Sequence, residues 1–521
     1  MPITELLSCN AKKYPNEVSL IEREPAKGVR REITWLEFEK EANRFSNALI
    51  ECGIKQGDRV ALLMMNCLEW LPVYFGILKV GALAVPLNFR YTADEIKRCV
   101  ETAGAKMLVY GPEFIDRINE IKDKLSGMES FIFVGDDCPD HAEKYTDFLA
   151  DFPTTDPQVP ICDTDDAALY FTSGTTGTPK PILLTHANLL SASITEKSHH
   201  QQCPEDCFLC IPPLYHTGAK MHWFGSLAVG SKAVLLRGVK PEWILEAVSD
   251  EKVSIVWLLV PWAQDILDAI ESKEVNLKDY HLEQWRLMHI GAQPVPPSLI
   301  IRWKKYFPKH MYDTNYGLSE STGPGCVHLG IENIHKVGAI GKPGHNWEIK
   351  IVDEHDKPVP RGKVGELLVR GPGVMKGYFN NPEATAKVLK NGWLYTGDMA
   401  QQDEDGFVYL VDRKKDVVIM GGENIYPVEI EAFLRANNDI KDVAVIGLPD
   451  RRLGEIPAAV VEVKSGRELT EEMLFEFCEE LPRYKRPRQI IFDKVPRNAT
   501  GKIEKPKLRE KYSKDRIAQV V

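Results

Sequence analysis

The segment from Tyr170 to Lys180 reads YFTSGTTGTPK and holds four threonines, one serine and two glycines before the closing lysine. It has almost no apolar mass, so it does not serve to build a core. Because glycine carries no Cβ, a ligand can come close to the backbone N–H groups of such a stretch. Backbone donors, hydroxyls and a fixed cation suit an anion, above all a phosphate. The sequence therefore predicts a phosphate-binding loop.

Two common phosphate-binding motifs do not match the spacing of this loop. A P-loop requires G-x-x-x-x-G-K-[ST]. Here Thr-Pro-Lys follows Gly177, and neither Ser nor Thr follows Lys180. The dinucleotide-binding fingerprint G-x-G-x-x-G is also missing from the sequence. The loop is therefore expected to belong to another class of nucleotide-binding protein.

Helical and strand patterns alternate before residue 340 and must position this loop. Thr34 predicts the cap of a helix that stops at Gly53. Short apolar strands such as DRVALLMMN, AALYFTS and VSIVWLLV follow one another with helices between them, which indicates α/β layers with mostly parallel sheets. The loop directly follows the strand AALYF, and such folds bind ligands at the ends of strands.

The pattern changes after residue 340. The segment WEIKIVDEHDKPVPRGKVGELLVRG predicts a small β-unit, and a hairpin, a Gly-Gly turn and a helix with Pro427 near its start follow it. We place a domain boundary in the polar VDRKKD segment, Val411 to Asp416. The prediction is a large α/β N-terminal domain over residues 1–413, including the β-unit, and a small mobile α+β C-terminal domain over residues 414–521.

Length and composition indicate a globular protein of several structural units. The 521 residues are too many for one simple core, since domains usually hold about 100–200 residues. Apolar residues make up 44% and charged residues 27%, which is ordinary for a globular chain. The N-terminus lacks the pattern of a signal peptide, and the longest apolar run is about half of a membrane span. We expect a cytoplasmic monomer or homodimer without a transmembrane segment.

The cysteines allow two interpretations. Cys203, Cys207 and Cys210 lie in CPEDCFLC with several histidines nearby, which could form a metal site. The alternative is a buried strand that uses cysteine as a small apolar residue, and the lack of paired C-x-x-C spacing favours it. An odd total of 11 cysteines indicates reduced thiols rather than a disulfide framework.

The charge distribution bears on the partners. The net charge of −10 argues against nucleic-acid binding. From Arg483 to Arg516, however, 13 Lys and Arg residues face 4 Asp and Glu residues, a local balance of +9 that leaves the rest of the chain near −19. This segment is either a solvated helical tail or a basic lobe that closes on a polyanion.

The loop resembles the [ST]SGTTGxPK signature of the acyl-adenylate-forming superfamily, which includes acyl-CoA ligases, luciferases and the adenylation domains of peptide synthetases. Further motifs of that family occur here in the same order and span nearly the whole chain. They are GALAVPLNFR (Gly81 to Arg90), PPLYHTG (Pro212 to Gly218), NYGLSES (Asn315 to Ser321), WLYTGD (Trp393 to Asp398), VDRKKDVVIMGGENIYPVEIE (Val411 to Glu431) and PRNATGKI (Pro496 to Ile503).

The resemblance implies an ATP site. A carboxylate that attacks the α-phosphate is already ionised, so the site must offset negative charge with donors, a cation and a metal ion. Asp398, helped by Arg413, would bind the ribose hydroxyls. The residues expected around the β- and γ-phosphates are Thr172, Ser173, Gly174, Thr175, Thr176 and Lys180. Those expected around adenine are Gly291, Ala292, Gln293, Thr314, Asn315 and Tyr316.

The resemblance also implies catalytic roles. Glu320 would bind Mg²⁺, and Ser319 would place its hydroxyl beside the α-phosphate. Lys502 would enter the site for adenylation, and Lys415 would be the hinge about which the small domain then turns. His216 lies either near the acyl and pantetheine passages or in a packed position without a catalytic role.

Two positions depart from the family pattern. Pro181 stands where glycine usually follows the lysine, which removes one N–H and fixes φ. Ser319 stands where threonine is common, which keeps the hydroxyl.

The acceptor of the acyl group is expected to be coenzyme A. Gly421 and Gly422 in MGGENIYP would let pantetheine pass against bare backbone, and Arg451 and Arg452 are candidate partners of the CoA phosphates. The alternatives are an enzyme that loads a carrier protein and a luciferase-like oxidoreductase. The sequence ends in AQVV, which is not a peroxisomal signal and mildly disfavours a luciferase.

The acyl pocket is expected to involve Gly218, Trp223 and Trp257, with other bulky aromatic residues nearby. Indole rings shorten a pocket, so we expect a medium-chain, cyclic or aromatic acid. The alternative is that these aromatic residues belong to the core. Lys220 and His222 leave open an acid with a second anionic group.

Overall fold

The computed structural model describes residues 1–172, 180–291, 295–421, 423–437, 439–497 and 503–520. Contacts divide the chain into two compact units. The first combines Met1–Ile349 with Val369–Leu394, and the second combines Lys350–Leu368 with Tyr395–Val521. The expected boundary at residues 413 and 414 falls inside the second unit, and as the border of a moving domain it stays a prediction.

The first unit contains two large sheets, and most of their strands run parallel. The eight-stranded sheet has the order β20-β9-β8-β4-β3-β5-β6-β7, with β9 and β20 antiparallel to their neighbours. Its strands are β3 (Arg59–Leu63), β4 (Leu83–Pro86), β5 (Met107–Tyr110), β6 (Ser130–Phe133), β7 (Glu143–Lys144), β8 (Asp166–Thr172), β9 (Lys180–Thr185) and β20 (Gly377–Tyr378).

The seven-stranded sheet has the order β14-β13-β12-β10-β11-β1-β2, and β2 is its antiparallel edge. Its strands are β1 (Val18–Glu24), β2 (Val29–Thr34), β10 (Cys207–Cys210), β11 (Lys232–Leu236), β12 (Ile255–Leu259), β13 (Leu287–Gly291) and β14 (Met311–Asp313). A short antiparallel sheet of β15 (Asn315–Leu318), β16 (Gly323–His328) and β17 (Lys342–Pro343) follows β14 in the chain.

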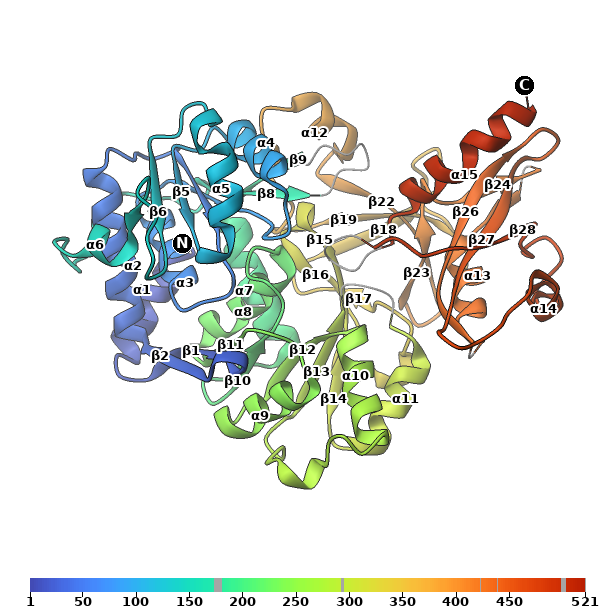
Figure 1. The fold of residues 1–521 in the computed structure, drawn as a ribbon, viewed down its shortest axis with the longest axis horizontal. Coiled ribbons are helices and arrows are strands. Elements are labelled where there is room, and N and C mark those ends of the chain that lie inside the picture. The colour runs from blue at the N-terminus through green and yellow to red at the C-terminus, as the bar shows by residue number, and fades with distance from the viewer. Residues whose placement is uncertain (173–179, 292–294, 422, 438, 498–502, 521) are drawn as a thin grey trace. The chain divides into compact units, whose positions relative to one another are not determined.

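Helices cover both faces of the large sheets. Strand alternation sets this arrangement: Val60 and Leu62 join the core of α2 and α3, while Ala61 and Leu63 join the core of α4 and α5. Helices α7 and α8 pack side by side between the two sheets, and α9 and α10 cover the outer face of the seven-stranded sheet (Figure 1). The helices of this unit are α1 (Thr4–Lys13), α2 (Trp35–Glu51), α3 (Trp70–Lys79), α4 (Ala93–Ala103), α5 (Ile115–Ile121), α6 (Tyr145–Leu149), α7 (His186–His200), α8 (Thr217–Val229), α9 (Pro241–Glu251), α10 (Val260–Glu271), α11 (Pro297–Tyr306) and α12 (Pro382–Val388).

Local sequence signals explain several element ends. Helix α2 begins after Thr34, whose side chain accepts from the backbone N–H of Glu37 in a capping box, as the sequence predicts. The C-cap of α2 is Cys52, and the predicted stop, Gly53, is the next residue. Gly53 adopts φ +79°, a left-handed conformation that ends a helix.

A five-stranded sheet follows in the chain. It consists of β18 (Glu348–Val352), β19 (Gly365–Arg370), β21 (Leu389–Lys390), β22 (Trp393–Gln402) and β23 (Val408–Arg413). This sheet corresponds to the predicted small β-unit.

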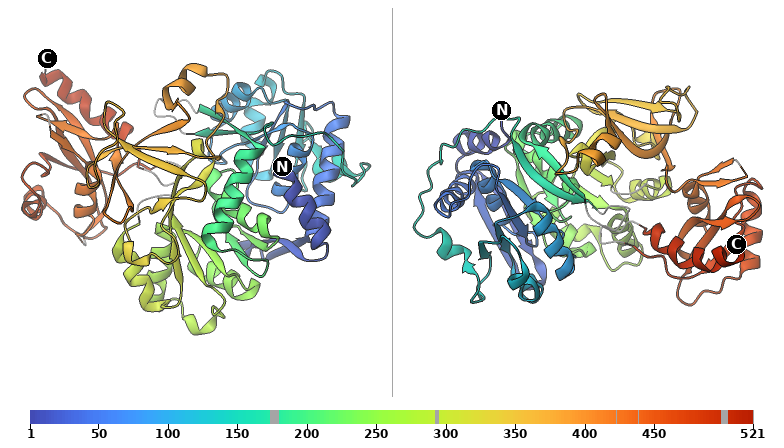
Figure 2. Two further views of the ribbon diagram at one scale, coloured as in Figure 1. Left: turned by 180° about the vertical axis from the view of Figure 1, so that it is seen from behind. Right: turned by 90° about the horizontal axis from the view of Figure 1, so that it is seen from above.

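The remainder of the second unit is an α+β body with its own core (Figure 2). Its elements are β24 (Val418–Met420), β25 (Glu423–Ile425), α13 (Pro427–Leu434), β26 (Ile440–Asp450), β27 (Gly454–Val463), α14 (Glu471–Phe477), β28 (Gln489–Phe492) and α15 (Lys505–Val520). Pro427 opens α13, where its missing N–H costs no helical hydrogen bond. The α/β class and the small α+β unit are confirmed.

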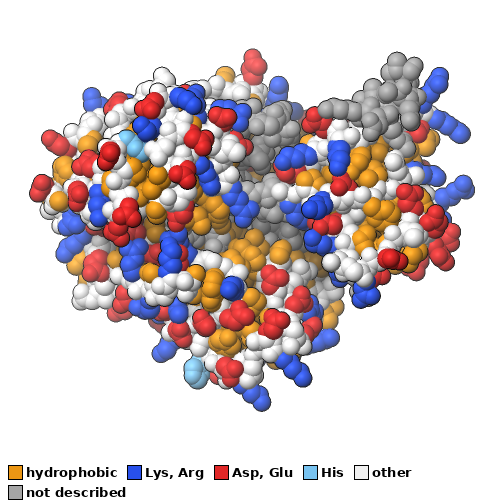
Figure 3. All heavy atoms as spheres, viewed as in Figure 1, with side chains coloured by type: hydrophobic (Ala, Val, Ile, Leu, Met, Phe, Trp, Pro, Cys, Tyr) orange, Lys and Arg blue, Asp and Glu red, His pale blue; other side chains and the backbone are white. Residues whose placement is uncertain are grey.

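The surface is mixed in charge. Acidic and basic side chains are interspersed over the face that Figure 3 shows. Among the helices that the structure describes, none combines the length and the apolar character needed to cross a bilayer.

Candidate active site

The predicted phosphate loop is held at both ends by an antiparallel strand pair. Thr172 ends β8, Lys180 begins β9, and the two residues are register partners. The Lys180 ammonium lies 5.3 Å from the ring centre of Tyr378, within the range of a cation–π contact. Pro181 lies in β9 opposite Phe171, and its carbonyl accepts the N–H of Phe379 at 2.9 Å. Ser173, Gly174, Thr175 and Thr176 lie outside the described residues.

Tyr378 links this lysine to the predicted metal ligand. Its hydroxyl donates to Oε1 of Glu320 at 2.9 Å. Burial, together with the neighbouring Glu320 carboxylate, raises the pKa of Tyr378, so the phenol keeps its proton and remains a donor. The Glu320 carbonyl also accepts the N–H of Met375 at 2.8 Å, which fixes the backbone beside β20. Sequence reasoning missed Tyr378, because only the pairing of β20 with β9 brings it to Lys180.

Ser319 and Glu320 lie in a short 3₁₀ turn, Ser319–Ser321, after β15. The Ser319 hydroxyl lies 3.1 Å from the hydroxyl of Thr217, the first residue of α8. A chain of contacts thus connects the loop, the turn and α8. Its members are Lys180, Tyr378, Glu320, Ser319 and Thr217. Positive charge, hydroxyl donors and a carboxylate alternate there, which is an arrangement that can bind a polyanion together with a cation.

The acyl candidates lie at the N-terminus of α8. His216 Nδ1 accepts the N–H of Gly218 at 3.1 Å and so caps the helix. A Cβ on Gly218 would lie 3.1 Å from the Trp257 ring, so the glycine permits this close approach. His222, one turn further on, stacks on Trp257 with ring centres 4.4 Å apart. Burial lowers the pKa of His222 to about 3, so the ring is neutral.

The residues expected around adenine lie where two neighbouring strands, β13 and β14, end. Gly291 ends β13 and Thr314 follows β14, the neighbouring parallel strand. Asn315 donates from Nδ2 to Nε2 of His222 at 3.1 Å, and Tyr316 lies in β15. The structure therefore joins this edge to the acyl candidates. Ala292 and Gln293 lie outside the described residues.

Two residues of the region expected to form the acyl pocket are fully buried. Trp223 is fully buried against Phe38 and Phe75, which favours a core role over a place in the acyl pocket. Its position one residue from His222 turns it about 100° around the helix axis. Lys220 is also fully buried, with its ammonium 3.6 Å from the Tyr74 ring centre, so it does not offer a cation for a second anionic group.

Two of the three cysteines follow the strand interpretation. Cys207 and Cys210 are buried in β10, three residues apart and therefore on opposite faces, while Cys203 is exposed. Among the residues that the structure describes, no cysteine belongs to a group with metal-ligand spacing.

In the second unit, the predicted ribose residues meet. Asp398 on β22 and Arg413 on β23 are register partners, and Arg413 Nε lies 3.4 Å from Asp398 Oδ1. Lys415 follows in the next turn, where burial lowers its pKa. Asp416 accepts from Arg509 of α15 at 2.7 Å, which ties this turn to the C-terminal helix.

The predicted CoA residues are partly described. Gly421 has φ +61°, a conformation that favours glycine, and its N–H donates to the Leu453 carbonyl at 2.8 Å. This bond brings the glycine turn beside the exposed turn that holds Arg451 and Arg452. Gly422 and Lys502 lie outside the described residues.

Comparison with known proteins identifies the family. The profile named AMP-binding enzyme matches residues 7–379, and the profile named AMP-binding enzyme C-terminal domain matches residues 429–502. The chain belongs to the AMP-binding enzymes, the adenylate-forming superfamily, and within it to the acyl-CoA synthetase type. The predictions of the family and of an acid–thiol ligase are thereby confirmed.

Relatives of this type cover nearly the whole chain. A long-chain-fatty-acid–CoA ligase, FadD13 of Mycobacterium tuberculosis, is 33% identical over 94% of this chain and 95% of its own length. A feruloyl-CoA synthase of Amycolatopsis is 33% identical over 92% of this chain and 94% of its own. The crystal structure of the anthranilate CoA ligase AuaEII with anthranoyl-AMP superposes with a TM-score of 0.88 at 27% identity, covering 99% and 98% of the two chains.

Proposed function

We propose that this protein is an ATP-dependent acyl-CoA ligase that works in two half-reactions. In the first, the carboxylate of an acid attacks the α-phosphate of ATP, the bond to the β-phosphate breaks, and acyl-adenylate and pyrophosphate form. In the second, the thiol of coenzyme A loses its proton and attacks the acyl carbon, and AMP leaves as the thioester forms. Pyrophosphate and AMP together account for the whole of the ATP.

The observation that carries this proposal is the group formed by Lys180, Tyr378 and Glu320 beside the predicted phosphate loop. A nucleophile with negative charge must approach a polyanion, so the catalyst needs fixed donors rather than a general base. Lys180 supplies a cation on the strand that follows the loop. Ser319 directly precedes Glu320 in the chain, and its hydroxyl lies 3.1 Å from that of Thr217. The α-phosphate would be bound beside these two hydroxyls.

The residues of this group fit Mg²⁺. The ion prefers one or two carboxylates together with substrate phosphates. Glu320 offers a carboxylate whose Oε1 is oriented by Tyr378. Glu320 would hold the ion, which supplies charge neutralisation for the phosphates when bound.

We assign the other roles by the same reasoning. Asp398 and Arg413 form a ready ion pair that would bind the ribose hydroxyls. Lys502 would act in adenylation, and rotation about Lys415 would then bring Gly421 and Gly422 to the thiol. The bond from Gly421 to the Leu453 carbonyl supports this assignment, because it places Arg451 and Arg452 near the proposed pantetheine passage.

The acid is proposed to be of medium chain length, cyclic or aromatic. The stacked rings of Trp257 and His222 beside Gly218 support a flat, closed pocket rather than a long channel. Because His222 is neutral, it would not bind a second carboxylate by charge.

The test measures the two half-reactions separately. An acid panel in the pyrophosphate-release assay should give the highest kcat/KM with compact cyclic or aromatic acids. Acyl-adenylate made from the best acid is then offered to CoA, to a phosphopantetheinylated carrier protein, or to oxygen with light detection. Rapid thioester formation with CoA alone is the expected result. Preference for the carrier protein would overturn the CoA assignment, and failure of every acid to release pyrophosphate would overturn adenylation itself.

A further inference from the structure

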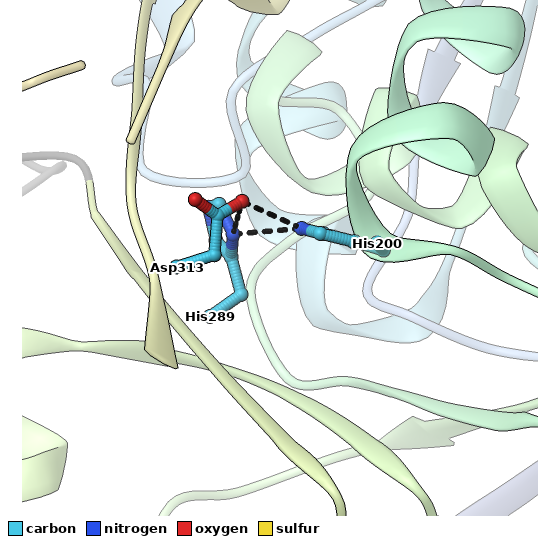
Figure 4. A group of neighbouring side chains, drawn as sticks. All are labelled: His200, His289 and Asp313. Atoms are coloured by element: carbon cyan, nitrogen blue, oxygen red, sulfur yellow. Dashed lines mark hydrogen bonds and ion pairs between the residues drawn. The ribbon is translucent and has the colours of Figure 1, made fainter. Parts of the chain in front are cut away.

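A closed group of histidine and carboxylate side chains lies where β13, β14 and the end of α7 meet. His289 and Asp313 are register partners on adjacent parallel strands, so their side chains leave the same face of the sheet. His200, the last residue of α7, reaches them from the helix layer, as Figure 4 shows. All three side chains are fully buried.

We propose that His200, His289 and Asp313 bind one zinc ion, which ties α7 to the C-terminal ends of β13 and β14. The proposal is independent of the substrate and of the second half-reaction. It concerns a structural ion apart from the Mg²⁺ that would accompany ATP.

Two of the three separations between the ligand atoms match zinc coordination, and the third, between the two imidazole nitrogens, is shorter. His200 Nε2 lies 2.9 Å from His289 Nδ1 and 3.3 Å from Asp313 Oδ2, and the last two atoms lie 3.5 Å apart. Zinc bonds of about 2.0–2.2 Å in a tetrahedron place ligand atoms about 3.3–3.6 Å from one another. The three atoms therefore already mark one face of such a tetrahedron, and little movement is needed to accept the ion.

The hydrogen bonds around His289 leave its Nδ1 without a proton, and this nitrogen faces His200 and Asp313. His222 Nδ1 donates to the Gly218 carbonyl at 2.5 Å, and its Nε2 accepts from the Asn315 amide at 3.1 Å. His289 Nε2 lies 3.0 Å from that same acceptor and must donate to it. In a neutral ring the proton is then on Nε2, so His289 Nδ1 presents its lone pair to His200 and Asp313.

The outer atoms of the ligands have the partners that metal ligands usually have. Asp313 Oδ1 accepts the N–H of Gly330 at 2.9 Å, which orients the carboxylate. His200 Nδ1 lies 3.5 Å from Glu196 Oε2. Zinc on Nε2 of His200 would place the ring proton on Nδ1, facing this carboxylate, as in a carboxylate–histidine–metal triad. If His200 were neutral and donated from Nε2 to His289, its Nδ1 would carry no proton. The lone pair of that nitrogen would then face the Glu196 carboxylate.

The chemistry of the ligand set selects the ion. Two imidazoles and one carboxylate suit Zn²⁺, with a water as the fourth ligand of the tetrahedron, whereas Mg²⁺ and Ca²⁺ prefer oxygen ligands alone. The position also gives the ion a role. Asp313 directly precedes Thr314 and Asn315, and His289 lies two residues before Gly291, so the ion would fix the sheet edge that carries the proposed adenine residues.

The first experiment uses the full wild-type chain, expressed with zinc in the medium, freed of any affinity tag and passed over a chelating resin. Elemental analysis should find about one zinc per chain, and unfolding in guanidinium should release it to a chromophoric chelator. Protein produced with Co²⁺ should show the intense visible bands of a tetrahedral cobalt site. A zinc content near zero in both folded and zinc-supplemented refolded protein would overturn the proposal and would mean that the group holds protons only.

Variants then locate the ion. His289→Gln and Asp313→Asn should each lower the zinc content at least tenfold. His310→Gln is the matched control, because His310 is also buried near β14 but packs against Trp285 outside the group, and it should keep the zinc. Unchanged zinc in both ligand variants would place the ion elsewhere and refute the assignment. The wild-type measurement decides the existence of the site even if a ligand variant fails to fold.

Discussion

Tyr378→Phe tests the link between the phosphate loop and Glu320 with the smallest possible change. The substitution removes the hydroxyl that donates to Glu320 at 2.9 Å but keeps the ring that lies 5.3 Å from Lys180. A hydrogen bond to a charged group contributes about 1.5–3 kcal/mol. At tenfold for every 1.36 kcal/mol, its loss lowers a rate by about 10- to 150-fold. Glu320 is partly exposed, so we expect the lower half of that range.

The assay is pyrophosphate release at varied ATP and Mg²⁺. Tyr378→Phe should lower kcat/KM for ATP by about 10- to 40-fold and raise the Mg²⁺ requirement, because the carboxylate loses its orientation. Conversion of supplied acyl-adenylate to thioester should stay unchanged. Tyr306→Phe is the matched control, since Tyr306 donates to an exposed carboxylate, that of Glu271, at 3.5 Å. Wild-type kinetics and an unchanged Mg²⁺ dependence in Tyr378→Phe would refute the proposed role of this contact.

Four further predictions concern other parts of the chain. Asp398→Ala should raise KM for ATP by about tenfold or more, through loss of a charge-assisted bond, and an unchanged ATP dependence would remove Asp398 from the site. Gly422→Leu should spare the first turnover of pyrophosphate and block thioester formation, whereas equal loss of both steps would place the pantetheine route elsewhere. Lys502→Ala should abolish adenylation and leave the thioester step with supplied adenylate, while Lys415→Pro should do the reverse; parallel losses in the two variants would contradict alternation. Lys220→Met should raise Tm near neutral pH, because burial lowers the pKa of this lysine well below its usual value and the unfolded chain then binds one proton more. That difference makes the wild type more stable as pH rises toward the ordinary lysine pKa. The Tm advantage of Lys220→Met should therefore shrink between pH 7 and about pH 10. An advantage that grows over this pH range would contradict the reasoning.

Local signals in the sequence were sufficient for much of the fold. The Thr34 cap, the stop at Gly53 and the start of a helix at Pro427 depend on residues within a few positions of each other, and the structure has them where they were predicted. The phosphate loop was also predicted from local composition, and its role stays a prediction. The strand before it and the lysine after it are register partners, as a hairpin requires.

Long-range pairing supplied what the sequence could not. Tyr378 follows the loop lysine by nearly two hundred positions and meets it only because β20 pairs with β9. His200, His289 and Asp313 likewise share no spacing, and their proximity depends on the register of two strands and on where α7 ends. Trp223, expected at the acyl pocket, is buried against Phe38 and Phe75 for a simpler reason. Neighbouring residues on a helix face different directions, so assigning a whole segment to a pocket includes core residues.

The contact between Asp416 and Arg509 has a consequence for recombination between related enzymes. Asp416 lies shortly after β23, Arg509 lies in α15, and their side chains meet at 2.7 Å. Asp412 accepts the N–H of Val428 at 3.0 Å in the same region. A chimera joined within α13 would take Asp416 and Arg509 from different parents and would have to rebuild this contact. A joint in the exposed turn at Glu404 and Asp405 would transfer them intact, so exchange of the small unit between ligases should succeed there and fail more often downstream.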